Sequence, residues 1–418
     1  MKILIKDGYC LGEEEGFFNL LIKDDTIEKI GKEIDDKADK NIDAKNCIVM
    51  PTFCNAHTHL AMSLFRGMAD DLSLMDWLNN HIFPNEAKFV NRDMVYKCSK
   101  LSMLEMIRGG TGCFMDMYFY EEEVAKAALE IGIKGVIGEG IVDFESPSCK
   151  SAEECISKTK SLQKEFESGN IKVSFAPHST YTLSTDSLKK IADAAENSII
   201  HIHINETKSE VDMVKKQKNL RPLEVLNSLN MLNKNTYLAH CVASSKEDMD
   251  LIKQNSSNVI NVPQSNLKLA SGIAPIYKMI NKGIDVFIGT DGSASNNNLD
   301  MLEEIRTMSL TQKVFEMNEK ALNAKESFNI GINPLFKKTG KLKEGYKADI
   351  AILKLDSIES VPLYNPYSYI VYAANSKSVD TVLINGKIIM EKREFVDIDE
   401  EKVKFEVKEI AKKLGSIF

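Results

Sequence analysis

Short β-rich runs alternate with longer segments of helical periodicity between about residues 51 and 291, and this alternation restricts the fold most strongly. The β-rich runs are Ile48–Phe53, Phe114–Met117, Gly135–Ile141, Lys172–Ala176, Ile199–Ile204, Thr236–Ala239, Val259–Val262 and Asp285–Ile288. The clearest helical segments between them are Arg92–Arg108, Glu121–Ile131, Ala152–Glu167, Thr185–Ala195, Lys246–Gln254 and Ile273–Asn281. Eight such units predict parallel strands with crossover helices, closed into a (β/α)8 TIM barrel.

Both ends of the chain lack this alternation and are rich in strands instead. The predicted terminal strands include Met1–Ile5, Phe17–Ile22, Ala348–Leu353 and Val379–Ile384. Asn385-Gly386 is a strong hairpin signal, and Glu400–Leu414 has helical spacing. We therefore expect a small β-sandwich domain built from residues 1–50 and 341–418, including a terminal helix, beside a barrel of residues 51–340.

Composition excludes several classes of protein. The 53 basic and 61 acidic residues give a net charge of −8 without a basic block, which argues against binding to nucleic acid or an anionic membrane. No apolar stretch is long enough for a transmembrane helix, and the N-terminus does not resemble a signal peptide. The eight cysteines include no C-x-x-C pair, so a thiolate zinc site is not expected. A cytoplasmic protein with reduced cysteines is the expectation.

The seven histidines are the strongest indication of chemistry. Metal-binding or acid/base side chains lie at the ends of five predicted barrel strands: His57 and His59, His178, His201 and His203 followed by Glu206, His240, and Asp291. Alternate residues of a strand share a face, and barrel enzymes place their active sites at the carboxyl ends of the strands. We therefore expect a metal or acid/base centre there. His201 lies one layer deeper and is expected to be structural or to support a ligand, and His81 to be an ordinary loop residue.

Several segments carry a family resemblance that runs over almost the whole chain. They are MPTFCNAHTH at 50–59, DWL at 76–78, PNEAK at 84–88, PHSTY at 177–181, HINET at 203–207, AHCV at 239–242, SNLKL at 265–269 and GTDGSASNN at 289–297. The chain resembles the amidohydrolase superfamily, which consists of (β/α)8 barrels with a flanking β-sandwich. Within it, the chain is most similar to the deaminases of 5′-methylthioadenosine and S-adenosylhomocysteine, which are relatives of the triazine hydrolases.

The resemblance implies a metal centre and a hydrolytic deamination. The implied ligands of one divalent metal ion, usually zinc, are His57, His59, His203 and Asp291. His178 stands where binuclear members carry a carboxylated lysine, which favours a single metal. Hydroxide formed at the metal would attack C6 of the purine while Glu206 protonates N1. His240 and Asp291 would orient the hydroxide and pass its proton to the departing ammonia. The implied products are an inosine analogue and ammonia.

The resemblance also assigns substrate contacts. Glu86 would hold the ribose hydroxyls, His178 would contact the purine, and Ser295 would assist Asp291. Trp77, with Leu72, Leu74 and Leu78, would cover an apolar thioether. Members that take S-adenosylhomocysteine tend to carry arginines after the third strand, where this chain offers only Lys150 and, with the wrong sign, Glu139. 5′-Methylthioadenosine or adenosine is therefore expected to be the better substrate, with S-adenosylhomocysteine still accepted.

Two alternatives stay open at this point. The same metal site would serve a free purine base such as guanine, or a triazine, for which Glu86 would have no ribose to hold. The chain would alternatively be a non-catalytic binding protein on a decayed barrel. The expected partner is a small purine nucleoside, without nucleic acid or membrane, and homo-oligomerisation is left open.

Overall fold

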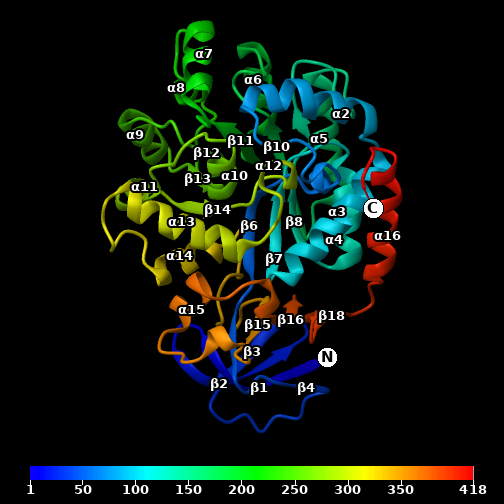
Figure 1. The fold of residues 1–418 in the computed structure, drawn as a ribbon, viewed down its shortest axis with the longest axis vertical. Helices are drawn as coiled ribbons and strands as arrows, with labels where there is room; N and C mark the ends of the chain where they lie inside the picture. Colours follow the sequence, from blue (N-terminus) through cyan, green and yellow to red (C-terminus); the bar gives the residue numbers. More distant parts are fainter. Residues whose placement is uncertain (418) are drawn as a thin grey trace.

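One sheet closes into the predicted barrel. The computed structural model describes residues 1–417 (Figure 1). The barrel strands are β6 (Phe53–Thr58), β7 (Thr111–Asp116), β8 (Lys134–Ile137), β10 (Ile171–Pro177), β11 (Ile199–Ile204), β12 (Thr236–His240), β13 (Asn258–Asn261) and β14 (Val286–Ile288). They pair in parallel in that order, and the short β9 (Gly140–Ile141) pairs with β10. The backbone amides of Thr290 and Asp291 donate to the carbonyl of His57, which joins the end of β14 to β6. The (β/α)8 prediction is confirmed.

Helices follow the strands around the outside of the barrel (Figure 1). They are α3 (Arg92–Arg108), α4 (Glu121–Ile131), α5 (Ala152–Phe166), α6 (Thr185–Ala195), α7 (Lys208–Lys218), α8 (Pro222–Ser228), α9 (Lys246–Gln254), α10 (Pro263–Lys268), α11 (Ile276–Asn281), α12 (Ser293–Asn296), α13 (Met301–Phe315) and α14 (Ala324–Gly331). Many begin at a side-chain cap, as where Ser151 accepts from the amide of Glu154 and Ser245 from that of Asp248. None of the helices within residues 1–417 is long and apolar enough to cross a membrane.

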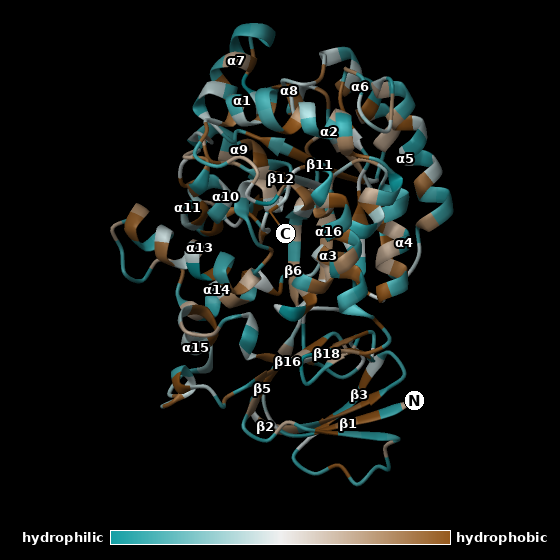
Figure 2. Ribbon diagram, turned by 45° about the vertical axis from the view of Figure 1, so that its right-hand side comes forward, coloured by the Kyte–Doolittle hydropathy of each residue, from teal (hydrophilic) through white to brown (hydrophobic). Residues whose placement is uncertain are grey.

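The two ends of the chain form a second sheet. Its strands are β1 (Lys2–Leu11), β2 (Glu15–Lys23), β3 (Thr26–Gly31), β4 (Lys40–Asp43), β5 (Cys47–Pro51), β15 (Ile350–Lys354), β16 (Val379–Ile384), β17 (Lys387–Glu391) and β18 (Glu394–Phe395). β5 lies between β1 and β15, so it joins the N-terminal strands to the C-terminal ones. Side chains such as Ile5, Ile22, Val49 and Ile352 from different strands pack together as a core separate from that of the barrel. Strand β1 has a brown stretch in Figure 2, in agreement with this apolar core.

The β16–β17 connection confirms the predicted hairpin at Asn385-Gly386. Gly386 has φ +70°, and a Cβ atom there would lie 1.9 Å from the carbonyl oxygen of Asp24. Only glycine fits this turn without moving the neighbouring loop. The predicted terminal helix is α16 (Glu400–Lys412), which packs against α3 and forms an ion pair between Glu400 and Arg108.

The assignment of Ile48–Phe53 to the first barrel strand is wrong. Cys47–Pro51 belongs to the terminal sheet, and the barrel begins with Phe53. The backbone amide of Thr52 donates to Asp349 of the terminal domain, whereas the next amide, of Phe53, donates to Gly110 of the barrel. Backbone hydrogen bonding thus passes from the terminal sheet to the barrel between two adjacent residues. The apolar run is buried on both sides of this point, so hydrophobicity does not mark it.

A largely helical segment follows β6 and extends over the barrel mouth. It contains η1 (Leu60–Phe65), α1 (Leu74–Asp76), the π-helix η2 (Trp77–Ile82) and α2 (Phe83–Phe89). π-Helical turns are rare and occur often at functional sites. Here the turn buries Trp77, Leu78 and Ile82. His81, predicted as a loop residue, lies within this turn.

Candidate active site

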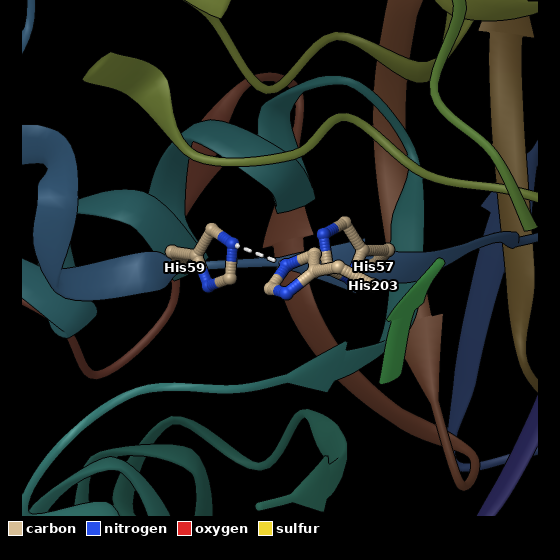
Figure 3. Close-up of side chains that lie close together, drawn as sticks. All are labelled: His57, His59 and His203. Atoms are coloured by element: carbon tan, nitrogen blue, oxygen red, sulfur yellow. Dashed lines mark hydrogen bonds between the residues drawn. The ribbon is translucent and has the colours of Figure 1, made fainter. Parts of the chain in front are cut away.

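The barrel brings the four predicted metal ligands together. His57 lies on β6 and His59 just beyond its end, His203 lies on β11, and Asp291 follows β14. Asp291 Oδ1 is 3.5 Å from His57 Nε2 and 3.2 Å from His59 Nε2. His203 Nε2 is 3.3 Å from His59 Nε2, and Figure 3 shows the three imidazoles facing one another. Ligand atoms of His57, His59 and His203 lie within 4.8 Å of one another, as do those of His57, His240 and Asp291.

The hydrogen bonds of the imidazoles fit a metal at this position. His57 Nε2 is buried without a hydrogen-bond partner, although it faces the ligand atoms of the other residues of the cluster. The opposite ring nitrogens are held: His57 Nδ1 lies 2.8 Å from His201 Nε2, and His203 Nδ1 lies 2.8 Å from the carbonyl oxygen of His178. His59 Nδ1 contacts the carbonyl of Met117. A ligating histidine is oriented in this way, with its second nitrogen held by a protein group. His201 lies behind His57, in the supporting position.

The charges of the cluster also suit a cation. Burial alone would raise the pKa of Asp291, but its contacts with His57 and His59 hold that pKa well below its usual range. Burial lowers the pKa of His57 to about 4. Burial opposes protonation of His59 as well, but the Asp291 carboxylate outweighs it and raises the pKa of His59 to about 9. A cation that binds here must therefore displace a proton from His59.

Two titratable side chains lie beside the cluster. Glu206 follows β11 and His240 ends β12, and Glu206 Oε2 is 3.8 Å from His240 Nε2. Burial and the nearby Asp291 carboxylate raise the pKa of Glu206. Burial would lower the pKa of His240, but the carboxylates of Glu206 and Asp291 raise it instead. A carboxyl group with a raised pKa can hold a proton near neutral pH and give it to a substrate.

A cavity of about 480 Å³ opens onto these groups. Its walls combine the cluster of histidines and carboxylates with an apolar outer part. Of the predicted substrate contacts it is lined by Trp77, Leu74, Leu78, Glu86, His178 and Glu206. Glu86 is buried, and burial raises its pKa to about 7, although the phenol of Tyr118 and the positive charge of His59 oppose this. Leu72 is not part of the lining.

The structure does not bring Lys150 to this cavity. Lys150 is exposed just before α5, where its backbone amide donates to Glu154 Oε2. The preceding loop residues Phe144–Pro147 line the cavity instead. No lysine or arginine occurs among the lining residues in the described part of the chain. The predicted contact between Lys150 and a substrate carboxylate therefore has no support in this geometry.

Glu139 faces the protein interior. It is fully buried, accepts from the backbone amides of Tyr120 and Glu121 at the start of α4, and lies 3.1 Å from Lys158 Nζ. An acidic side chain at a helix N-terminus stabilises the helix. Glu139, which we expected to repel a substrate carboxylate, therefore stabilises the start of α4 instead.

Ser295 reaches Asp291 only through another residue. Its hydroxyl is buried 3.0 Å from Ser265 Oγ and donates to the carbonyl of Gly292. Ser265 Oγ donates to Asp291 Oδ2 at 2.7 Å. Ser265 belongs to the SNLKL motif, so the sequence contained a signal for it that its residue type alone did not reveal.

Other cavity residues differ in the signal that the sequence gave for them: Tyr181 and Leu269 belong to the PHSTY and SNLKL segments, whereas Tyr118 and Phe144 lie outside all the quoted segments. Tyr118, Phe144, Tyr181 and Leu269 line the cavity from four different connections. Aromatic and aliphatic residues in loops are common, and the sequence does not show which of them turn inward.

A (β/α)8 barrel with three imidazoles and one carboxylate converging at the carboxyl ends of its strands belongs to the class of metal-dependent barrel enzymes. A model of the amidohydrolase family matches residues 48–389. This chain therefore belongs to the amidohydrolase family.

Curated relatives and a solved structure match the chain along nearly its full length. It is 41% identical to a 5-methylthioadenosine/S-adenosylhomocysteine deaminase of Aquifex aeolicus, over 96% of this chain and 95% of that protein. It is 43% identical to a 5′-deoxyadenosine deaminase of Methanosphaera stadtmanae, over 99% of both. The crystal structure of an adenosine deaminase from Xanthomonas campestris with bound zinc superposes with a TM-score of 0.96 at 28% identity, covering 99% of each chain.

Proposed function

We propose that this protein is a metal-dependent hydrolytic deaminase of adenosine-type nucleosides that carry a small, uncharged 5′ group, such as 5′-methylthioadenosine or 5′-deoxyadenosine. The observation that carries the proposal is the placement of Glu206 and His240 beside the cluster of ligands, inside a cavity that also holds the buried Glu86. The deaminases among its relatives support the same reaction and a hydrolase acting on carbon–nitrogen bonds.

One zinc ion per chain is the metal we propose. Three imidazole nitrogens and one carboxylate oxygen form a donor set that zinc takes readily, and His57, His59, His203 and Asp291 supply it. The zinc in the adenosine deaminase structure supports this choice. When bound, the ion supplies a water activated for attack near neutral pH.

The chain's own residues move the protons. Glu206, whose pKa is raised, donates a proton to a ring nitrogen of the purine and thereby makes the neighbouring carbon electrophilic. His240 donates through Nδ1 to Asn266, so its Nε2 is free to take a proton from the attacking water. That proton then passes to the amino group that leaves. A C–O bond forms and the C–N bond breaks: the water oxygen becomes the carbonyl oxygen of the inosine-type product, and the amino nitrogen leaves as ammonia. The second proton of the water restores the proton that Glu206 gave to the ring nitrogen.

The cavity favours a nucleoside with a neutral 5′ end. Glu86 would accept hydrogen bonds from the ribose hydroxyls, and His178 would contact the purine. Trp77 and the leucines beside it offer an apolar surface for a methylthio or methyl group. A 5′ carboxylate in this cavity would find no lysine or arginine among the lining residues and would meet Glu145, which is unfavourable.

An assay against a panel of purines tests the proposal. The zinc-loaded protein should release ammonia from 5′-methylthioadenosine, 5′-deoxyadenosine and adenosine, and guanine should be a poor substrate. A free base or a triazine leaves Glu86 without a hydroxyl to bind. Faster turnover of guanine or a triazine than of every nucleoside would contradict the proposal.

A further inference from the structure

One short segment of the chain contacts both proposed proton-transfer groups, Glu206 and His240, and one proposed metal ligand, Asp291. The segment comprises α10 (Pro263–Lys268) and the turn that follows it to Ser271, and we call it the α10 segment. It provides none of the proposed metal ligands and none of the proposed reacting groups. Its contacts run to residues on three different strand ends: Ser265 to Asp291, Asn266 to His240, and Ser271 to Glu206.

We infer that Ser265, Asn266 and Ser271 are positioning residues that fix the geometry of proton transfer. The inference rests on the proposed function. It goes beyond that function because it assigns the orientation of the acid and base groups to a single element of the barrel.

Ser265 fixes the Asp291 carboxylate. Asp291 Oδ1 faces His57 and His59 and accepts from the amide of Gly292, while Oδ2 accepts from Ser265 Oγ at 2.7 Å. The serine is fully buried, so water cannot replace this bond. The bond therefore prevents the carboxylate from rotating, and it keeps one oxygen directed at the metal cluster.

Asn266 fixes the ring of His240. His240 Nδ1 donates to Asn266 Oδ1 at 2.9 Å, which leaves Nε2 as the acceptor that faces Glu206. The other polar atom of the amide, Asn266 Nδ2, is buried without a partner. The side chain therefore acts through its oxygen alone, and the nitrogen contributes no bond that a substitution would break.

Ser271 fixes Glu206 and is tied to Asn266. Ser271 Oγ donates to Glu206 Oε1 at 3.2 Å, and the backbone amide of Ser271 donates to the carbonyl of Asn266 at 2.8 Å. Lys268 anchors the same segment to Asp70 across the barrel mouth. Because these contacts share one stretch of backbone, the three groups keep their relative positions together.

The test compares two substitutions at Asn266 with a control on the same helix. Asn266→Ala removes the acceptor, whereas Asn266→Asp keeps an acceptor oxygen at that position and replaces the unpartnered nitrogen by a second oxygen, which adds a carboxylate beside His240. The control is Gln264→Ala, because the Gln264 side chain points to Glu303 and Thr307, away from the cavity. Each purified variant is loaded with zinc, and its metal content, thermal unfolding, kcat and KM for 5′-methylthioadenosine are measured.

Asn266→Ala should lower kcat about 10- to 100-fold, the usual effect of removing a group that orients an active-site residue, with KM and zinc content little changed. Asn266→Asp should recover most of that loss, and Gln264→Ala should behave as wild type. In parallel, Ser271→Ala should lower kcat with zinc retained. Ser265→Ala should also weaken zinc binding, measured by competition with a chelator, because Ser265 holds a proposed ligand.

Two results would overturn the inference. The first is a zinc-loaded Asn266→Ala variant with kcat within about twofold of wild type. The second is a Gln264→Ala variant as slow as Asn266→Ala, since a general disturbance of α10 would then explain both losses. If wild-type protein loaded with zinc deaminates no adenosine-type nucleoside, the proposed function fails as well, and this outcome is distinct from the first two.

Discussion

Replacing Glu86 with glutamine should weaken catalysis and at the same time stabilise the fold. Glu86 is buried in the cavity wall, and burial raises its pKa from 4.5 to about 7. Glutamine has nearly the same shape but never carries the charge. The substitution therefore tests two effects of the charge on Glu86 separately: its contribution to substrate binding and its cost to the stability of the fold.

The stability effect follows from proton linkage. Between pH 4.5 and about 7 the folded protein keeps the proton on Glu86 that the unfolded chain has lost. The unfolded state then binds fewer protons, so the free energy of unfolding falls as pH rises through this interval. At about 1.4 kcal/mol for each pH unit, the loss is about 3 kcal/mol above pH 7. Glu86→Gln should remove this pH dependence and should be more stable than wild type at pH 8.

The catalytic effect has the opposite sign. Hydrogen bonds to a charged group contribute about 1.5–3 kcal/mol, so losing the carboxylate should lower kcat/KM for adenosine by about one to two decades. The loss should be much smaller for 2′,3′-dideoxyadenosine, which has no ribose hydroxyls to bind. Glu145→Gln is the matched control, because Glu145 lines the same cavity but is exposed.

Urea unfolding at pH 5 and pH 8, together with steady-state kinetics on both nucleosides, measures these effects. An equal loss on adenosine and on its dideoxy analogue would refute the assignment of Glu86 to the ribose. A variant less stable than wild type at pH 8 would refute the claim that the buried charge is unfavourable to the fold.

Three further predictions concern the metal, the proton donor and the substrate. Elemental analysis should find one zinc-like ion per chain, and two ions per chain would contradict the single site. The apparent affinity for the ion should fall up to about tenfold per pH unit below pH 9, because the ion competes with the proton on His59. Glu206→Gln should lower turnover about 10²- to 10⁴-fold with zinc retained, and a rate near wild type would exclude Glu206 as the proton donor. Steady-state kinetics should give a kcat/KM for 5′-methylthioadenosine about 10- to 100-fold above that for S-adenosylhomocysteine, since no lysine or arginine lines the described cavity. The reverse order would show that the tail carboxylate binds outside this lining.

The barrel and the approach of its ligands were predictable because they depend on local order. A strand presents alternate side chains on one face, so His57 and His59 had to share a direction. Parallel strands with crossover helices deliver their carboxyl ends to the same rim, so residues as distant in sequence as His59 and Asp291 were expected to meet. Helical periodicity marked α3, α4, α5, α6 and α9 for the same local reason.

Tertiary structure decided the features that depend on the path of loops and on contacts between distant segments. The apolar run at Ile48–Phe53 contains no sign of the point where hydrogen bonding changes from one sheet to the other. Lys150 and Phe144 lie in the same connection, but only the aromatic residue turns toward the cavity. Ser265 and Asn266 hold Asp291 and His240 through side-chain bonds that no periodicity encodes. A repeating backbone fixes the direction of each side chain from its neighbours, whereas a loop takes its direction from whatever packs against it, and only the folded chain determines that.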